Sequence, residues 1–388
     1  MLKVLHIISS MNPCSGGVCQ AVRSYIYGMK DITSIDNEVL CLDHPDSEYI
    51  KSEKSVIYSL GMVYNYTSWN YNKILKSWLK SNLSNYDIII VHGLWQYQTY
   101  AVYQVLKRVI NRPKLLVMPH GMLDPYFQKA KGRKVKAIRN TIFWKLIESK
   151  LINLADGVLF TCEEEKLLAR QPFTPYYPKR EVVIGLGVES PPVYDDRMTQ
   201  SFFEKCVGWN QKPFLLFLSR IHEKKGVDLL VKSYLKIKKE NADIPQLVIA
   251  GPGIDTPYGQ EIVKLAEGDK DILFPGMLSG ENKWGAFYNC GAFILPSHQE
   301  NFGIAIVEAM ACEKAVLITD KVNIWRDIEK NRAGLVAVDT EDNIYKMLKD
   351  WLSLSILEQH EIGMNARNTY LESFSIEKAS EKMVSVLS

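Results

Sequence analysis

Several features that often reveal a protein's function are missing from this sequence of 388 residues. No apolar run reaches the roughly 18–20 residues that span a bilayer. The seven cysteines are scattered and include no Cys-x-x-Cys pair, which argues against a zinc site and a disulfide framework. The glycine fingerprints of dinucleotide-binding dehydrogenases and P-loop NTPases are absent as well. We therefore expect a cytoplasmic protein that is neither a dinucleotide-binding dehydrogenase nor a P-loop NTPase.

The composition narrows the choice further. Apolar residues make up 47% of the chain, which excludes intrinsic disorder, and 23 Gly with 16 Pro exclude a collagen-like repeat. The 47 basic residues nearly balance the 44 acidic ones, so the net charge of +3 predicts no nucleic-acid partner. At roughly 100–200 residues per domain, the length favours two domains.

Short apolar runs alternate with longer amphipathic stretches along the chain, which predicts parallel sheets covered by helices on both faces. The runs are Val4–Ile8, Val39–Leu42, Asp87–Val91, Lys114–Met118, Gly157–Phe160, Phe214–Leu218, Gln246–Ala250, Ile272–Phe274, Gly291–Leu295 and Ala315–Ile318. A proline cluster between residues 172 and 192 interrupts the series. We predict an α/β chain with two doubly wound domains, residues 1–195 and 196–370. Residues 371–388 are expected to form a helix that packs back on the first domain.

Two basic residues follow one strand of the second domain. Arg220 and Lys225 lie in the loop between the run Phe214–Leu218 and an amphipathic helix. Ligands of such sheets bind at the carboxyl ends of the strands, so both charges can converge on one anion. A guanidinium beside an ammonium suits a diphosphate leaving group, and a solvated basic loop is the plain alternative.

A Glu-x7-Glu pattern follows another strand of the same domain. Glu300 and Glu308 flank Gly303, which can begin a helix and point free backbone N–H groups at a phosphate. At about 100° per residue, one continuous helix brings both carboxylates to within about 80° of each other, two turns apart. A carboxylate also accepts hydrogen bonds from both hydroxyls of a ribose. Two surface charges are the alternative.

The sequence resembles the retaining nucleotide-sugar glycosyltransferases of family 4 (glycosyl transferases group 1) at Arg220, Lys225-Gly226 and the pair Glu300 and Glu308. The resemblance covers essentially the whole chain. It includes three weaker motifs, namely Gly16-Gly17, Gly251-Pro252-Gly253 and the segment Phe274–Leu278. It implies the GT-B fold, in which two Rossmann-like domains enclose a deep cleft, and a nucleotide sugar as substrate.

The resemblance also implies a role for each donor-binding position. Arg220 and Lys225 would bind the diphosphate. Glu308 would hold the ribose, and Glu300 would contact the transferred sugar. The donor-binding residues are then Gly16, Gly17, Arg220, Lys225, Gly251, Met277, Leu278, Glu300, Asn301, Phe302, Gly303, Ile304 and Glu308. Members of the family need no metal and no other cofactor, because basic side chains and a helix terminus stabilise the leaving group.

In the first domain, the motif His120-Gly121-Met122-Leu123 follows a strand and is similar to a His-Gly-Met-Leu subgroup of the family. The histidine of that subgroup faces the donor sugar from the acceptor side, and a purely structural histidine is the alternative. The implied catalytic residues are His120, Glu300, Arg220 and Lys225. The residues expected on the acceptor side are His92, Trp95 and Asp124.

Eight basic residues stand against the single acid Glu148 in the stretch Lys129–Lys150. Apolar residues recur there at helical spacing in two rows, Ile138-Ile142-Leu146 and Phe143-Ile147. Such a helix can lie on anionic lipid, or receive an acceptor that carries a lipid diphosphate. The alternative is an apolar face in the core with the charges in water. We favour peripheral contact with the inner face of the plasma membrane.

Together with the resemblance, these features predict a retaining, metal-independent hexosyltransferase of the bacterial surface-polysaccharide type. It would move a hexose from a nucleoside-diphosphate sugar, with UDP-glucose as the first choice, to a growing polysaccharide or a lipid-linked acceptor. The departing phosphate would take the acceptor proton. Two alternatives stay open, a nucleotide-sugar epimerase-like enzyme of the same fold and a noncatalytic nucleotide-sugar-binding protein.

Overall fold

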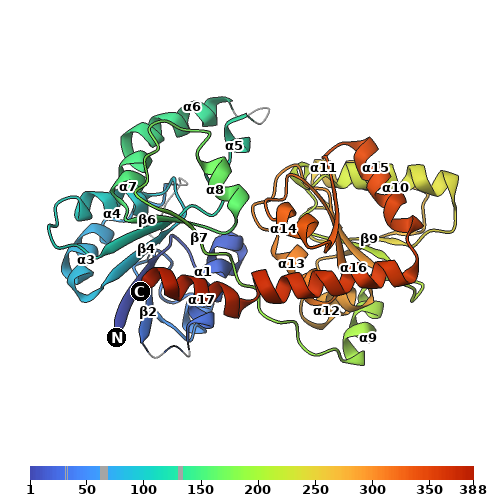
Figure 1. The fold of residues 1–388 in the computed structure, drawn as a ribbon, viewed down its shortest axis with the longest axis horizontal. Helices are drawn as coiled ribbons and strands as arrows, with labels where there is room; N and C mark the ends of the chain where they lie inside the picture. The colour runs from blue at the N-terminus through green and yellow to red at the C-terminus, as the bar shows by residue number, and fades with distance from the viewer. Residues whose placement is uncertain (31, 33, 62–68, 130–133) are drawn as a thin grey trace. The chain divides into compact units, whose positions relative to one another are not determined.

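A computed structural model of the protein describes residues 1–30, 32, 34–61, 69–129 and 134–388. The chain divides into an N-terminal unit, Met1–Gly187 with Ile376–Ser388, and a C-terminal unit, Val188–Ser375 (Figure 1). The boundaries therefore follow residues 187 and 375 instead of the predicted 195 and 370. One reason is a hydrogen bond of 2.9 Å from the Val188 N–H to the Phe374 carbonyl, which ties both residues to the C-terminal unit.

The described strands of the N-terminal unit form one parallel sheet in the order β3-β2-β1-β4-β5-β6-β7 (Figure 1). They are β1 (Leu2–Ile7), β2 (Ile35–Cys41), β3 (Val56–Ser59), β4 (Ile88–His92), β5 (Lys114–Met118), β6 (Gly157–Phe160) and β7 (Glu181–Val183). The interior strands coincide with the predicted apolar runs and are largely buried, as strands with a helix layer on each face require. The edge strands β3 and β7 are half-exposed, and the apolar-run criterion misses them.

Helices cover both faces of this sheet. They are α1 (Gly17–Gly28), α2 (Glu48–Lys51), α3 (Leu75–Asn82), α4 (Tyr97–Leu106), α5 (Tyr126–Lys129), α6 (Lys134–Phe143), α7 (Ser149–Leu154), α8 (Glu163–Ala169) and α17 (Ile376–Leu387). A π-helical turn, Trp144–Glu148, joins α6 to α7. Its Trp144 is fully buried, stacks on Phe173 with ring centroids 4.9 Å apart, and donates its indole N–H to the Pro175 carbonyl at 2.9 Å. The indole therefore anchors the end of α6 in the core.

The C-terminal unit, all of whose residues are described, contains a parallel sheet in the order β10-β9-β8-β11-β12-β13. Its strands are β8 (Leu215–Leu218), β9 (Leu247–Ala250), β10 (Ile272–Gly276), β11 (Ala292–Leu295), β12 (Ala315–Thr319) and β13 (Gly334–Ala337). Its helices are α9 (Asp196–Lys205), α10 (Val227–Glu240), α11 (Pro257–Ala266), α12 (Gly280–Asn289), α13 (Ile304–Ala311), α14 (Trp325–Lys330), α15 (Glu341–Ser353) and α16 (Ile356–Thr369). In the described parts of the chain, no helix is both long and apolar enough to cross a membrane.

The last helix, α17, packs against α1 in the N-terminal unit (Figure 1). The Lys114 ammonium donates a hydrogen bond of 2.7 Å to the Val386 carbonyl near the end of α17. The start of α17 lies so close to Gly187 that a Cβ added there would be 2.5 Å from the Cα of Ile376. Backbone cannot yield as a flexible side chain can, so this position accepts only glycine without displacing the helix.

We expect Gly187→Ala to lower the free energy of unfolding of the N-terminal unit by about 1–3 kcal/mol, because the added methyl group overpacks the contact with α17. Gly17→Ala is the matched control, since a Cβ at Gly17 meets no atom within 4 Å. Urea denaturation of both variants measures the difference. Equal stability of the two variants would contradict the close approach at Gly187.

Candidate active site

The loops that follow β8 and β11 lie close together at the carboxyl edge of the C-terminal sheet. Gly226 has a left-handed backbone with φ of 64°, and a Cβ there would lie 2.1 Å from the Pro296 carbonyl oxygen. The His298 N–H donates to the Lys224 carbonyl at 2.9 Å, which fixes the two loops to each other. This close approach explains why glycine follows Lys225 in the sequence.

Lys225 and Glu300 meet where these two loops touch. The Lys225 ammonium donates to the Glu300 carboxylate, and both side chains are mostly buried. Burial alone would raise the pKa of Glu300, but the positive charge and hydrogen bond of Lys225 outweigh it, so the pKa lies below its ordinary value. The Glu300 backbone is held by the loop after β12, since its N–H donates to the Lys321 carbonyl and its carbonyl accepts from Asn323, each at 2.9 Å. The site is therefore an ionised pair on a rigid backbone.

Helix α13 begins next to this pair. It starts at Ile304 with Gly303 as N-cap, whose carbonyl accepts from the N–H groups of Ile306 and Val307 at 2.9 and 3.3 Å, so the N–H groups of Ile304 and Ala305 are the ones exposed at the helix start. Such a terminus attracts anions. Glu300 lies before the helix, in a bridge to Val322, and the predicted angular relation between Glu300 and Glu308 on one helix is therefore wrong. Glu308 is on α13, where its carboxylate accepts from the Lys283 ammonium at 2.8 Å.

The other predicted donor-binding residues of the C-terminal unit lie on neighbouring loops. The Gly251 N–H donates to the Gly276 carbonyl at 2.8 Å, which ties the segment holding Met277 and Leu278 to the end of β9. The side chain of Met277 is exposed, whereas that of Leu278 is buried, so Leu278 could contact a ligand through its backbone but not through its side chain. Arg220 is exposed at the end of β8.

Four further predicted positions are Asn301, Phe302, Gly16 and Gly17. The Asn301 side-chain oxygen accepts from the Asn323 amide at 3.2 Å. Phe302 is buried edge-on against Phe374, with ring centroids 5.7 Å apart. Gly16 and Gly17 belong to the N-terminal unit, where Gly16 is the N-cap of α1 and open space surrounds both Cα atoms. All of these assignments stay predictions as regards ligand contact.

In the N-terminal unit, three imidazole rings form a hydrogen-bonded row. Nδ1 of His6 lies 3.0 Å from Nε2 of His92, and Nδ1 of His92 lies 3.0 Å from Nε2 of His120. The rings come from β1, from β4 and from the loop after β5. Burial lowers the pKa of His6 to about 4 and that of His120 to about 3, so the rings are neutral at pH 7. The predicted acceptor-side residue His92 is buried within this row.

The backbone at His120 is left-handed, with φ of 52°, and the following Gly121 has φ of 76°. A non-glycine residue in this region costs roughly 1–2 kcal/mol, which the surroundings must offset. Glu165 of α8 does so, because its buried carboxylate accepts from the Gly121 N–H at 2.5 Å and from the Thr161 N–H at 2.7 Å. The backbone of the loop that holds His120 is thus fixed by the hydrogen bond from Gly121 to Glu165.

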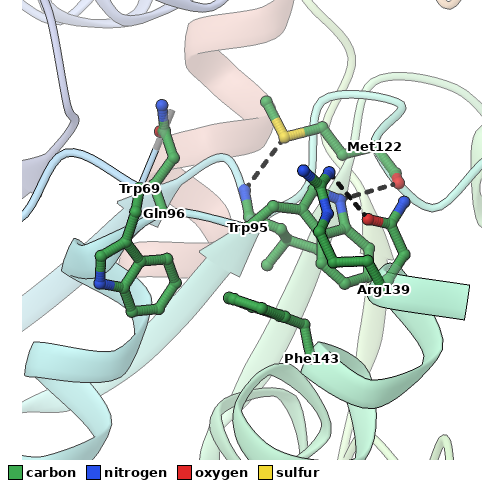
Figure 2. A pocket seen from close by; sticks show the side chains of 8 residues that line it. Trp69, Trp95, Gln96, Met122, Arg139 and Phe143 are labelled. Carbon is green, nitrogen blue, oxygen red and sulfur yellow. Dashed lines mark hydrogen bonds between the residues drawn. The ribbon is translucent and has the colours of Figure 1, made fainter. Parts of the chain in front are cut away.

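A pocket of about 480 Å³ opens near the carboxyl ends of β4 and β5 (Figure 2). Its lining residues are Trp69, Leu94, Trp95, Gln96, Met122, Arg139, Asn140 and Phe143. Aromatic rings line it, and Arg139 adds a positive charge. Trp95 was expected on the acceptor side and lines the pocket. Asp124 does not; its carboxylate accepts from the Tyr126 N–H at 2.8 Å at the start of α5.

Glu148 is a buried acid. The charge pattern of the sequence does not reveal its burial. One of its oxygens accepts from the Trp95 N–H and from the Thr99 hydroxyl, each at 2.9 Å. The other oxygen has no hydrogen-bond partner within the described residues. Burial raises the pKa of Glu148 to about 8. Because Trp95 has a φ of 69°, the Glu148 hydrogen bond supports a strained residue of the pocket. The sequence feature that could have singled out Glu148 is its position as the single acid in a basic stretch.

Comparison with known proteins bears on the C-terminal unit first. Residues 200–369 match the family model described as glycosyl transferases group 1. The matched segment includes the Lys225–Glu300 pair and the start of α13. The C-terminal unit is therefore similar to glycosyl transferases group 1 domains.

Curated relatives match part of the chain. A probable sucrose-phosphate synthase from Thermosipho melanesiensis is 26% identical over 165 residues, which cover 40% of this chain and 37% of that protein. An N,N'-diacetylbacillosaminyl-diphospho-undecaprenol alpha-1,3-N-acetylgalactosaminyltransferase from Campylobacter jejuni is 28% identical over 174 residues, 45% of this chain and 43% of that protein. The chain thus spans less than half the length of either relative.

Solved structures resemble the whole chain. HepE from Anabaena, in complex with UDP and glucose, has a TM-score of 0.76 at 16% identity and covers 100% of this chain and 99% of its own. A sucrose-phosphate synthase from Thermosynechococcus elongatus has a TM-score of 0.75 at 17% identity, with coverage of 100% and 98%. At such identities the likeness concerns the fold alone, and it confirms the predicted two Rossmann-like domains of GT-B glycosyltransferases.

We expect Glu148→Gln to remove a pH dependence of stability. The folded protein keeps a proton on Glu148 up to a pH of about 8, whereas the unfolded chain releases it near 4.5, so wild-type stability falls as pH rises between these values. The variant should gain roughly 4 kcal/mol relative to wild type between pH 5 and pH 9, measured by urea denaturation. Glu361→Gln, at an exposed acid of α16, is the control. A constant difference between Glu148→Gln and wild type at all pH values would contradict the burial of this proton.

Proposed function

We propose that the chain is a retaining glycosyltransferase that transfers a hexose from a nucleoside-diphosphate sugar to a saccharide or lipid-linked acceptor. The observation that carries this proposal is the Lys225–Glu300 pair beside the N-terminus of α13, within the segment that matches the glycosyl transferases group 1 model. A cation beside the N-terminus of a helix suits a diphosphate. A carboxylate beside them suits the hydroxyls of the attached sugar.

The donor diphosphate would lie against Lys225, Arg220 and the first turn of α13. As the anomeric carbon–oxygen bond breaks, negative charge grows on the departing phosphate, and these groups stabilise it. The phosphate oxygen then takes the proton of the acceptor hydroxyl, which attacks from the same face and retains the anomeric configuration. No bound metal is needed in this scheme, because the protein's own cations face the leaving group.

UDP-glucose is the proposed donor. Support comes from the solved HepE structures, whose descriptions name UDP-glucose, and from UDP with glucose in the same protein. For the acceptor, the Campylobacter relative acts by name on a diphospho-undecaprenol-linked sugar. The pocket beside β4 and β5 suits such an acceptor, because Trp95 and Phe143 can pack on a pyranose face while Arg139 can pair with a phosphate. We propose cell-surface polysaccharide assembly as the setting.

We expect Lys225→Ala to lower kcat/KM for nucleotide release from UDP-glucose by about 10²–10³-fold, because one of the charges that stabilise the leaving diphosphate is lost. Lys232→Ala on α10 is the matched control, since this lysine pairs with Asp228 of the same helix. Thermal unfolding of each variant checks that the fold survives. Wild-type turnover by a folded Lys225→Ala protein would refute the diphosphate site, and wild-type protein that binds UDP without turning over any donor would be a binding protein.

The basic helix supplies a second partner in this proposal. In α6, the apolar side chains of Val135, Ile138 and Ile142 are exposed by 82%, 64% and 52%, so this row does not lie in the core. At about 100° per residue the three fall within an arc of about 60°, with Lys134 on one side and Lys136 on the other. An apolar stripe flanked by cations fits the surface of an anionic membrane. Lys131 and Arg133 of the predicted basic run lie outside the described residues.

We expect the protein to sediment with vesicles that contain anionic phospholipid, and not with purely zwitterionic vesicles. The double variant Ile138→Ser with Ile142→Ser should lower the partition coefficient at least tenfold, because two apolar side chains no longer enter the interface. The control is Ile356→Ser with Leu357→Ser, which removes two apolar residues of α16 that are more exposed still. Sedimentation that ignores lipid charge, or that both double variants reduce equally, would contradict the membrane contact.

A further inference from the structure

The row of imidazoles in the N-terminal unit is longer than its three rings. Nε2 of His6 lies 3.1 Å from the side-chain oxygen of Asn37 on β2. The four side chains Asn37, His6, His92 and His120 therefore cross the adjacent strands β2, β1 and β4 and end at the loop after β5. The planes of neighbouring rings differ by 20° and 27°, which is compatible with a hydrogen bond from the N–H of one ring to the lone pair of the next.

The chemistry of each end gives this row a direction. A neutral imidazole has one N–H donor and one acceptor nitrogen, and an amide oxygen can only accept. Nε2 of His6 must therefore carry a proton, which leaves its Nδ1 to accept from Nε2 of His92. By the same argument, Nδ1 of His92 accepts from Nε2 of His120. The proton positions along the whole row follow from Asn37.

We infer that Asn37, His6 and His92 act as positioning residues that hold His120 as the Nε2–H tautomer, with Nδ1 as an acceptor for a sugar hydroxyl. None of the described residues approaches Nδ1 of His120 within hydrogen-bond distance. His120 itself is only partly buried, so a ligand can reach it. The backbone hydrogen bond from Gly121 to Glu165 holds the same loop from the other side.

This inference rests on the proposed function for the identity of the ligand, and it narrows the substrate class. A lone pair held in place binds a group that donates a hydrogen bond, such as a hydroxyl of a neutral hexose. A carboxylate in the same position, as in a uronic acid, offers only acceptors and is rejected. A row of neutral imidazoles suits the binding of a hydroxyl, because it carries no net charge that would attract an anionic ligand instead.

The tautomer can be measured without any sugar. Long-range 1H–15N correlation spectra of histidine-labelled protein at pH 7.5 distinguish a protonated from an unprotonated ring nitrogen. His120 should show a protonated Nε2 and an unprotonated Nδ1 in wild type. In Asn37→Leu and in His6→Phe its signals should move toward those of a mixture of both tautomers. His360→Gln, which removes an exposed histidine of α16, serves as control and as an aid to assignment.

A second readout links the tautomer to the sugar. With the nucleotide-hexose donor that the wild type uses, Asn37→Leu and His6→Phe should lower kcat/KM by about 3- to 10-fold, the worth of one hydrogen bond. His360→Gln should not. An Nδ1–H tautomer at His120, or a tautomer that neither Asn37→Leu nor His6→Phe changes, overturns the inference. Because the spectra need no substrate, a protein that lacks transferase activity refutes the proposed function separately.

Discussion

Parallel strand pairing is the constraint on which every site of this protein depends. It places the carboxyl ends of all strands at one edge of each sheet, so residues far apart in the sequence meet there. In the C-terminal unit, this brings Lys225 after β8 to Glu300 after β11, a separation of 75 positions along the chain. In the N-terminal unit it aligns His6, His92 and His120 across three neighbouring strands.

The two candidate sites treat buried ionisable groups in opposite ways. Beside α13, Lys225 holds the pKa of Glu300 below its ordinary value, which keeps this carboxyl group charged. In the site of the N-terminal unit, burial lowers the pKa of His120 to about 3 and raises that of Glu148 to about 8, which keeps both groups neutral. Charged groups suit a diphosphate, whereas neutral donors and acceptors suit sugar hydroxyls. This division agrees with donor chemistry in one unit and hydroxyl recognition in the other.

The sequence predicted the fold wherever burial was complete. All ten apolar runs became strands, because strands buried on both faces must be continuously apolar. The edge strands β3, β7 and β13 are half-exposed and were not predicted, although β13 is the apolar run Gly-Leu-Val-Ala. Incomplete burial is what these three strands share.

The candidate site was predicted less evenly, for physical reasons. The loops that follow the apolar runs could be located in the sequence, so both Lys225 and Glu300 were predicted to lie in the site. The start of a helix at Gly303 was predicted and is confirmed, whereas the placing of Glu300 on the same helix was wrong, because Glu300 lies before the left-handed N-cap Gly303. His6 was not singled out within the apolar run Val4–Ile8, and Glu148 was noted only as the single acid of a basic stretch. Both have partners from other strands and helices, and sequence periodicity says nothing about such tertiary contacts.

The central claim is that the protein transfers a sugar with retention of configuration. NMR spectroscopy of the product formed from UDP-α-glucose and a lipid-linked or saccharide acceptor tests it most directly. The account predicts UDP release together with an α-linked glucoside, identified by the coupling constant of its anomeric proton. A β-linked product, an epimerised nucleotide sugar, or bound but unreacted donor with every acceptor would contradict it.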